Sequence, residues 1–200
     1  MKTATIREYK ENDYENLREV CFRTATGAYT KNKEITAALF VEYYIEHESE
    51  HCFVVADKDD NAVGYIICAP DYSEFVKKFI KYKQPKIRKL SLKEAIIRRL
   101  EFMYMKRIGN KYPAHLHIDI LDDYQRMGLG HKLINKLMRH LNEIGVSRLH
   151  LGCSAQNIKG VNFYNKIGFH KVRKIAGAVI FGIDIAEYVS KLDEKEKNVQ

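Results

Sequence analysis

A short stretch of the chain, DYQRMGLGHKLI (residues 123–134), places two glycines and an arginine where a strand pattern gives way to a helix pattern. A helix that begins directly after a strand exposes unpaired backbone N–H groups and the positive end of its dipole, and phosphate groups bind well there. Glycine has no Cβ, so a ligand can approach the backbone closely. The run from Gln125 to Gly130, with the charge of Arg126, therefore predicts a cradle for a pyrophosphate group.

Two better-known phosphate motifs do not fit this turn. A P-loop requires GxxxxGK[ST], and the chain contains no such spacing. A dinucleotide-binding turn requires GxGxxG, but Leu133 occupies the position of the third glycine. That motif also needs an acidic residue about 20 positions further on, where this chain has His150 among apolar neighbours. The alternative that remains is a tight turn that only packs.

Three titratable side chains alternate along the strand expected at 114–121. His115, His117 and Asp119 should therefore face the same side of a sheet. Histidine can take up a proton near neutral pH, whereas Asp119 would need a raised pKa or a water relay. The HxHxD spacing could also hold a metal ion, but Ile120 stands where an HxHxDH box has its closing histidine, so no metal site is predicted. A polar sheet face without chemistry is the other interpretation.

Composition indicates an ordinary globular protein. The chain has 200 residues, 46% of them hydrophobic and 30% charged, which favours one domain with a full core. No apolar run is long enough to span a membrane, and the first residues lack the apolar core of a signal peptide. The four cysteines form no CxxC pair and lie in apolar surroundings, which favours reduced thiols. These features together predict a cytoplasmic protein.

Positive charge is concentrated in one segment. Residues 77–111 contain thirteen Lys or Arg and only two acids, whereas the whole chain carries a net charge of +8. Such a segment could attract an acidic acceptor, a nucleotide phosphate or a nucleic acid. Aromatic residues among these charges could stack on bases, but they also fit helical packing. A solvated helix face is the plainer interpretation.

The order of strand and helix patterns is mixed. It predicts an α/β (α+β) domain with a central, mostly antiparallel mixed sheet of about seven strands, flanked by helices and containing one parallel crossover. The expected strands cover residues 3–9, 51–56, 62–69, 114–121, 148–153, 169–175 and 178–185. The expected helices cover residues 14–26, 34–47, 75–82, 91–107, 129–145 and 160–167.

A second motif lies downstream, in LHLGCSAQNIKGVNFYNKIGF. Its spaced residues are Asn157, Gly160, Tyr164, Lys166 and Gly168-Phe169. With QRMGLG before it at the right distance, the pair resembles the GNAT superfamily of acyl-CoA-dependent acetyltransferases, whose phosphate turn reads [QR]xxGx[GA]. The stretches EVCFRTATG and VGYIICAPD look most like the acetyltransferase-like domain of bifunctional O-GlcNAcases and its free-standing bacterial relatives.

The resemblance implies a GNAT-like fold for most of the chain. Residues 1–190 would form a single domain, followed by a charged tail at 191–200. Residues 72–112 depart from the family pattern, because the family usually passes directly from one strand to the next at this point. They would form a basic helical insertion.

The resemblance also implies how acetyl-CoA, the co-substrate, would bind. Its pantetheine arm would enter between splayed strands at 115–121 and 148–154. Asn157 would position the arm, and Tyr164 would sit beside the sulfur and give a proton to the departing thiolate. The other implied contacts are the backbone of Ile118, Asp119 and Ile120, and the phosphate turn formed by Gln125, Arg126, Met127, Gly128, Leu129, Gly130 and His131.

The acceptor implied by the resemblance is a primary amine, which is protonated at neutral pH and must lose a proton before it attacks. Asp119 or His117 is the expected base. For Tyr164, aromatic packing against Phe163 and Phe169 is the alternative role.

The function predicted first is an N-acetyltransferase that works by direct attack in a ternary complex on an acceptor that the sequence does not identify. A non-catalytic acyl-CoA-binding protein is one alternative. A nucleic-acid or acidic-partner binder acting through residues 77–111 is the other, and a less favoured one. A homodimer is a further possibility, and no membrane partner is expected.

Overall fold

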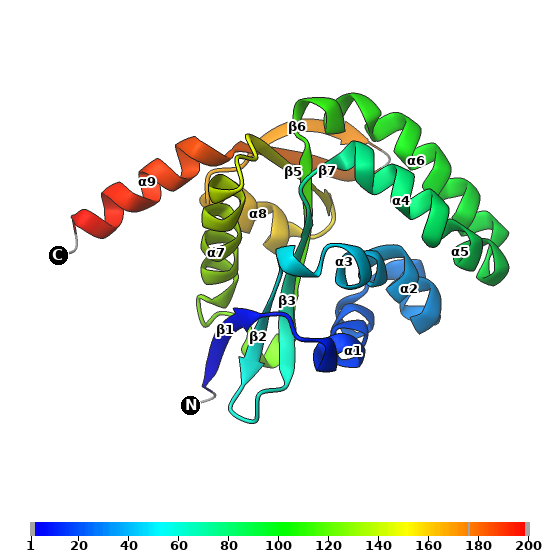
Figure 1. The fold of residues 1–200 in the computed structure, drawn as a ribbon, viewed down its shortest axis with the longest axis horizontal. Helices are drawn as coiled ribbons and strands as arrows, with labels where there is room; N and C mark the ends of the chain where they lie inside the picture. Colours follow the sequence, from blue (N-terminus) through cyan, green and yellow to red (C-terminus); the bar gives the residue numbers. More distant parts are fainter. Residues whose placement is uncertain (1–2, 176, 199–200) are drawn as a thin grey trace.

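The computed structural model describes residues 3–175 and 177–198. Within this part of the chain, seven strands form one sheet in the order β1-β2-β3-β4-β5-β7-β6 (Figure 1). The strands are Ala4–Glu8 (β1), Cys52–Asp57 (β2), Ala62–Ala69 (β3), Ala114–Ile120 (β4), Arg148–Ser154 (β5), His170–Ile175 (β6) and Ala178–Asp184 (β7). The predicted mixed, mostly antiparallel sheet is confirmed.

The pairing between β4 and β5 differs from all the others in the described sheet. It is parallel, and it involves only Ala114 with Leu149 and His115 with His150. In contrast, β3 pairs with β4 as far as Ile120, and β5 pairs with β7 throughout its length. The two central strands therefore separate after their first residues. The backbone edges that face each other there have no partner strand, although each strand keeps its other neighbour.

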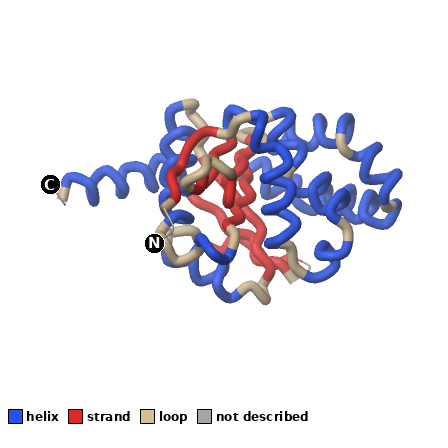
Figure 2. Tube along the Cα trace, turned by 90° about the horizontal axis from the view of Figure 1, so that it is seen from below, coloured by secondary structure: helices blue, strands red, loops and turns tan. Residues whose placement is uncertain are grey.

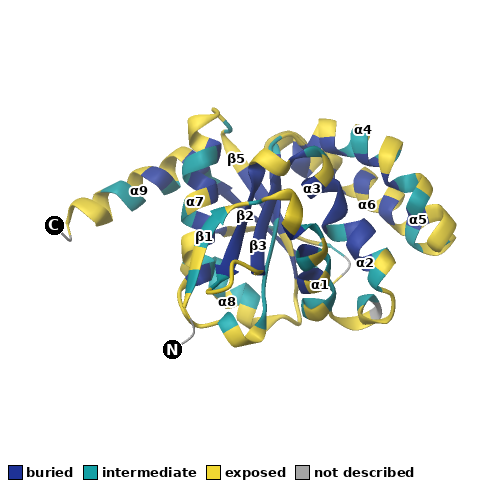
Figure 3. Ribbon diagram, turned by 60° about the horizontal axis from the view of Figure 1, so that its bottom comes forward, coloured by how far each residue is buried: buried dark blue, intermediate teal, exposed yellow. Residues whose placement is uncertain are grey.

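Helices cover both faces of the sheet, as Figure 2 shows from a second direction. One core lies between the sheet and α1 to α6, and the other lies between the sheet and α7 to α9. The residues of the central strands are mostly buried, and the outer helices carry exposed residues on their far sides (Figure 3). The helices are Tyr14–Thr24 (α1), Lys33–Phe40 (α2), Glu42–His47 (α3), Tyr72–Tyr82 (α4), Gln84–Leu90 (α5), Leu92–Lys111 (α6), Leu129–Glu143 (α7), Ile158–Lys166 (α8) and Ile185–Lys197 (α9).

The segment between β3 and β4 consists almost entirely of three helices, α4, α5 and α6. Local signals set its boundaries: Asp71 caps α4, Pro85 stands in the first turn of α5, and Ser91 caps α6. A side chain at Gly109 would collide with the ring of Tyr72, so α4 and α6 pack closely there. The insertion is thus a compact helical unit.

Three details differ from the sequence-based expectations. The helix expected at 34–47 is interrupted at Val41, which separates α2 from α3. The apolar stripe of α6 that begins with Leu92 and Ile96 lies on the exposed face, because Ala95, Phe102 and Met105 supply the buried one. The C-terminal segment continues to residue 197 as α9, which had not been expected.

Tertiary contacts hold this last helix. Asp184 caps α9, Tyr188 donates a hydrogen bond to Asn135 of α7 at 2.5 Å, and Arg139 of α7 pairs with Asp193 at 2.7 Å. These partners are distant in sequence, so the charged run KLDEKEK gave no local indication of them. Among the described helices, none is both long and apolar enough to cross a membrane.

Candidate functional site

The predicted phosphate turn lies at the start of α7, directly after β4. Arg126 and Gly128 both have left-handed backbone angles, with φ of 63° and 75°. A non-glycine residue in this region is uncommon, and such strain often accompanies a functional site. The Gln125 side chain donates a hydrogen bond to the carbonyl of Ile120 at 2.9 Å, which ties the turn to the end of β4. The turn is exposed from Gln125 to Gly128.

The two glycines of the turn have different roles. A Cβ at Gly128 would meet no atom within 4 Å, so the space in front of the turn is open to a ligand. A Cβ at Gly130 would lie 3.2 Å from the ring of Phe163 in α8. Gly130 therefore permits close packing of α7 on α8, whereas Gly128 allows the turn itself. The first N–H groups of α7 have no partner inside the helix, so they can bind an anion.

The second motif forms the start and the buried face of α8. The side chain of Asn157 caps the helix by accepting a hydrogen bond from the Gly160 N–H at 2.9 Å. A Cβ at Gly160 would lie 3.0 Å or less from Asn157 and 3.0 Å from the Cys153 sulfur, so only glycine fits there. The motif thus brings α8 against the open part of β5.

Tyr164 projects from α8 into the core between Phe169 and Phe181. Burial raises the pKa of its phenol, and the nearby Cys153 and Asp119 raise it further. The phenol therefore stays protonated at neutral pH and can donate a proton. Tyr164 therefore lies close to one side chain of each central strand, Asp119 of β4 and Cys153 of β5.

Asp119 faces the α1 side of the sheet, and Tyr65 of β3 donates a hydrogen bond to its carboxylate at 2.5 Å. Burial raises the pKa of Asp119 to about 6, although hydrogen bonds from Tyr65 and Thr24 oppose the shift. A carboxylate with this pKa is ionised at neutral pH and is close to the optimum for a general base.

His117 precedes Asp119 on the same face, beside Phe40 and Tyr44. Burial, with a smaller contribution from Arg98, lowers the pKa of His117 to about 3. The pKa of His115 is also lowered well below its usual value by burial, and Tyr44 contacts its Nε2 at 2.6 Å. Both imidazoles are therefore neutral, and His117 is a weak base.

A cluster of side chains that could hold a cation lies away from His117 and Asp119. Among the described residues, the group of side chains close enough to share a cation is Glu48, Glu50 and His51, which lies elsewhere in the fold. The HxHxD side chains are not part of it.

A cavity of about 620 Å³ lies beside the open strands. Its walls come from β4, from β5, from the β6–β7 hairpin and from the helices α2, α3, α4 and α6. His115 and His117 line it, and Leu151 to Ser154 of β5 form another wall. Asp119 and Tyr164 lie beyond this lining. The cavity therefore adjoins the predicted reaction centre from the side opposite α7.

The sequence motifs did not reveal the residues that α2 and α6 contribute to this cavity. They include Phe40, Ile97, Arg98, Leu100 and Tyr104. The only available signal was apolar periodicity in α6, and periodicity predicts a helix without showing which of its faces borders a cavity.

The predicted site residues therefore gather around the gap between β4 and β5. Ile118 and Ile120 pack towards the α7 side, and Asp119 points to the opposite side. The phosphate turn lies at the far end of β4, and Asn157 lies at the end of β5. This arrangement suits an elongated ligand with an anionic group at α7 and its other end near Tyr164.

Comparison with known proteins adds independent information. A model of the acetyltransferase (GNAT) family matches residues 12–169. An uncharacterized N-acetyltransferase of Methanocaldococcus jannaschii is 21% identical over 180 residues, covering 88% of this chain and 65% of that protein. An N-alpha-acetyltransferase of Sulfurisphaera tokodaii is 25% identical over 136 residues, covering 66% of this chain and 65% of that protein. The chain thus spans 65% of the length of each of these relatives.

Solved structures share the fold. The crystal structure of SsHAT is 27% identical, with a TM-score of 0.83, covering 92% of this chain and 98% of that one. The ribosomal-protein-S18-alanine N-acetyltransferase from Escherichia coli is 18% identical, with a TM-score of 0.55, covering 92% and 94%. The PaiA N-acetyltransferase from Thermoplasma acidophilum, solved with coenzyme A, is 16% identical, with a TM-score of 0.54, covering 91% and 99%.

Proposed function

The chain belongs to the acetyltransferase (GNAT) family, and we propose that it transfers an acetyl group from acetyl-CoA to a primary amine. The observation that carries this proposal is the gap between β4 and β5, which pair at only two positions and then separate. This gap lies between the open phosphate turn of α7, the partly buried Tyr164 and the cavity beyond it.

The residues fit acetyl-CoA as a substrate. The N–H groups from Arg126 to His131 would bind the pyrophosphate, with Gln125 holding the turn in place. Backbone groups of β4 from Ile118 to Ile120 would bind the pantetheine arm, because in the part of the chain that the structure describes no strand pairs with that edge. Asn157 lies at the end of β5 beside the same arm.

We assign the proton transfers to two residues. Asp119, directly or through a water molecule, takes a proton from the ammonium group of the acceptor, and the free amine then attacks the thioester carbonyl. The new C–N bond forms and the C–S bond breaks within a ternary complex. Tyr164 gives its proton to the departing thiolate. His117 serves this chemistry less well, because its pKa of about 3 makes it a weak base at neutral pH.

Several related assignments are part of this proposal. Residues 1–190 are taken as one domain with a helical insertion at 72–112, and a cytoplasmic location agrees with the four free, buried cysteines. The closer kinship to the O-GlcNAcase-linked domains rests on the sequence stretches of the N-terminal half. A binding role for the insertion alone is not favoured, and two of its thirteen cations, Lys83 and Lys86, already pair with Glu46 and Glu42 of α3.

Amine-dependent release of thiol from acetyl-CoA tests the proposal. The wild-type protein should release CoA only when a primary amine is added, and the product should be the N-acetylated amine by mass spectrometry. Tyr164→Phe should bind acetyl-CoA with unchanged affinity but lower kcat by about 10²–10⁴-fold, the usual value of a positioned acid. An unchanged kcat in this variant would remove Tyr164 from the mechanism, and wild type that binds acetyl-CoA without acetylating any amine would support the non-catalytic alternative.

A further inference from the structure

The cavity beside the reaction centre has walls that define a ligand class. It measures about 620 Å³, within the usual range of small-molecule sites. Aromatic and aliphatic side chains form most of its surface, with Phe40 and Tyr29 on one side and residues of α6 on the other. Such a wall stabilises a ligand through the burial of apolar surface.

The cavity has almost no net charge. Of its lining residues, only Arg98 and Glu101 belong to the charged types, and they pair with each other at 3.0 Å. The guanidinium of Arg98 also lies over the ring of Phe40, 5.3 Å from its centroid. The charge of Arg98 is therefore already balanced. The other twelve cations of residues 77–111 are absent from this lining.

Three apolar side chains of α6 line the cavity and are still exposed. Ile97, Leu100 and Tyr104 have exposed fractions of 42%, 45% and 64%. A ligand with an apolar body would bury them. The imidazoles of His115 and His117 on the opposite wall are neutral, because burial and the charge of Arg98 both lower their pKa values, so they add no charge to the cavity.

We propose that this cavity is the acceptor site and that the acceptor is a primary amine on an uncharged aromatic or aliphatic body, seated between α2 and α6. This inference rests on the proposed acetyl transfer, whose acceptor it specifies. The amine would point towards β4 and the apolar body towards Leu100 and Tyr104. A carboxylate beside the amine, or a second ammonium group, would lie in the cavity without a partner and would be rejected. An acidic acceptor, which the basic segment had suggested, does not fit these walls.

Three small amines test the proposal: phenethylamine, L-phenylalanine, which adds a carboxylate to the same skeleton, and putrescine, which carries a second ammonium group. The kcat/KM for phenethylamine should exceed that for each of the others at least about tenfold. Leu100→Ala should lower kcat/KM for phenethylamine about tenfold, whereas Leu92→Ala should leave it unchanged. Leu92 is the matched control because it lies on the same helix, is 57% exposed and is not part of the lining.

A binding measurement separates this inference from the proposed reaction. Phenethylamine is titrated into protein saturated with CoA, so that no acetyl transfer is needed. Binding that Leu100→Ala weakens and Leu92→Ala does not would support the acceptor site even if no product forms. A preference for L-phenylalanine or putrescine, equal effects of the two variants, or no binding of phenethylamine would overturn the inference.

Discussion

Two residues on one strand were equally good candidates for the base, and their surroundings distinguish them. Asp119 has a pKa raised to about 6, because burial disfavours its charge. Burial disfavours the charge of His117 too, but for an imidazole this lowers the pKa, here to about 3. At neutral pH both groups are deprotonated. Only Asp119 holds a proton strongly enough, once it has accepted one, to assist an amine.

The pH dependence of the rate follows from this difference. Below pH 6 Asp119 becomes protonated and can no longer accept a proton, so kcat should fall about tenfold per pH unit on the acid side. The acid limb of the kcat profile, measured with saturating acetyl-CoA and amine, should have an apparent pKa near 6.

Two variants show which residue is responsible for the acid limb of the kcat profile. Asp119→Asn should lower kcat by about 10²–10⁴-fold and abolish the limb, because its amide does not titrate. His117→Asn should keep the limb near pH 6. A limb that survives in Asp119→Asn, or that disappears in His117→Asn, would transfer the role of the base away from Asp119.

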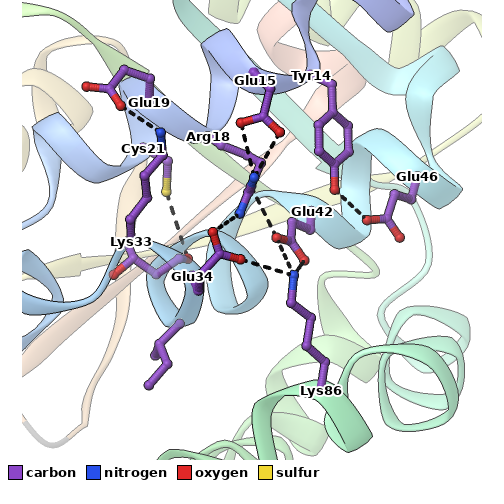
Figure 4. Close-up of polar contacts among 12 residues, drawn as sticks. Tyr14, Glu15, Arg18, Glu19, Cys21, Lys33, Glu34, Glu42, Glu46 and Lys86 are labelled. Atoms are coloured by element: carbon purple, nitrogen blue, oxygen red, sulfur yellow. Dashed lines mark hydrogen bonds and ion pairs between the residues drawn. The ribbon is translucent and has the colours of Figure 1, made fainter. Parts of the chain in front are cut away.

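At the scale of elements, the position of the insertion depends on one buried carboxylate. Glu42 of α3 has a side chain only 1% exposed, and Lys86 of α5 approaches both of its oxygens at 2.8 Å (Figure 4). Arg18 of α1 lies 3.3 Å away, and Lys83, between α4 and α5, lies 3.5 Å away. The group joins the α1–α3 layer to the insertion. It therefore helps to hold α5 against α1 and α3.

Removing this carboxylate should loosen the insertion. Glu42→Gln removes one negative partner from the buried Lys83 and one from the partly buried Arg18, which keep Glu46 and Glu34, and should lower the free energy of unfolding by roughly 3 kcal/mol. Glu34→Gln is the matched control, since Glu34 also pairs with Arg18 and Lys86 but is 51% exposed. Its cost should stay below about 1 kcal/mol. Urea unfolding of both variants measures the difference, and equal losses would show that the buried group does not hold the insertion.

For the molecule as a whole, the sequence predicted best what depends on near neighbours. The turn at 125–130 needs only residues a few positions away, so its motif indicated it. The capping role of Asn157 was not predicted, although it too depends on a near neighbour, Gly160. The strands were predictable because each carried a local pattern, alternating in β4 and continuously apolar in β2 and β3, and the fold was confirmed. The separation of β4 from β5 could be predicted only from the family resemblance.

The cavity and the last helix depend on contacts between distant segments. Both sides of α6 carry apolar residues, so its periodicity could not tell the outward Leu92 from the buried Phe102. The position of α9 depends on its contacts with Arg139 and Asn135 of α7. No local sequence pattern connects these residues with α9. The pKa values that separate Asp119 from His117 likewise follow from burial, which a sequence pattern does not quantify.

Binding of acetyl-CoA at the α7 turn is the central claim, and calorimetric titration tests it most directly. The titration compares wild type with Gly128→Glu and with Gly128→Ala. Both substitutions place a side chain at a left-handed residue and carry the same backbone strain. Only glutamate adds a negative charge and enough length to occupy the open space where the pyrophosphate would bind.

The expected result is micromolar binding to wild type, weaker but measurable binding to Gly128→Ala, and none to Gly128→Glu. Circular dichroism should show that all three proteins are folded. Unchanged binding in Gly128→Glu, or no binding of acetyl-CoA by the folded wild type, would contradict the assignment of this turn as the phosphate site.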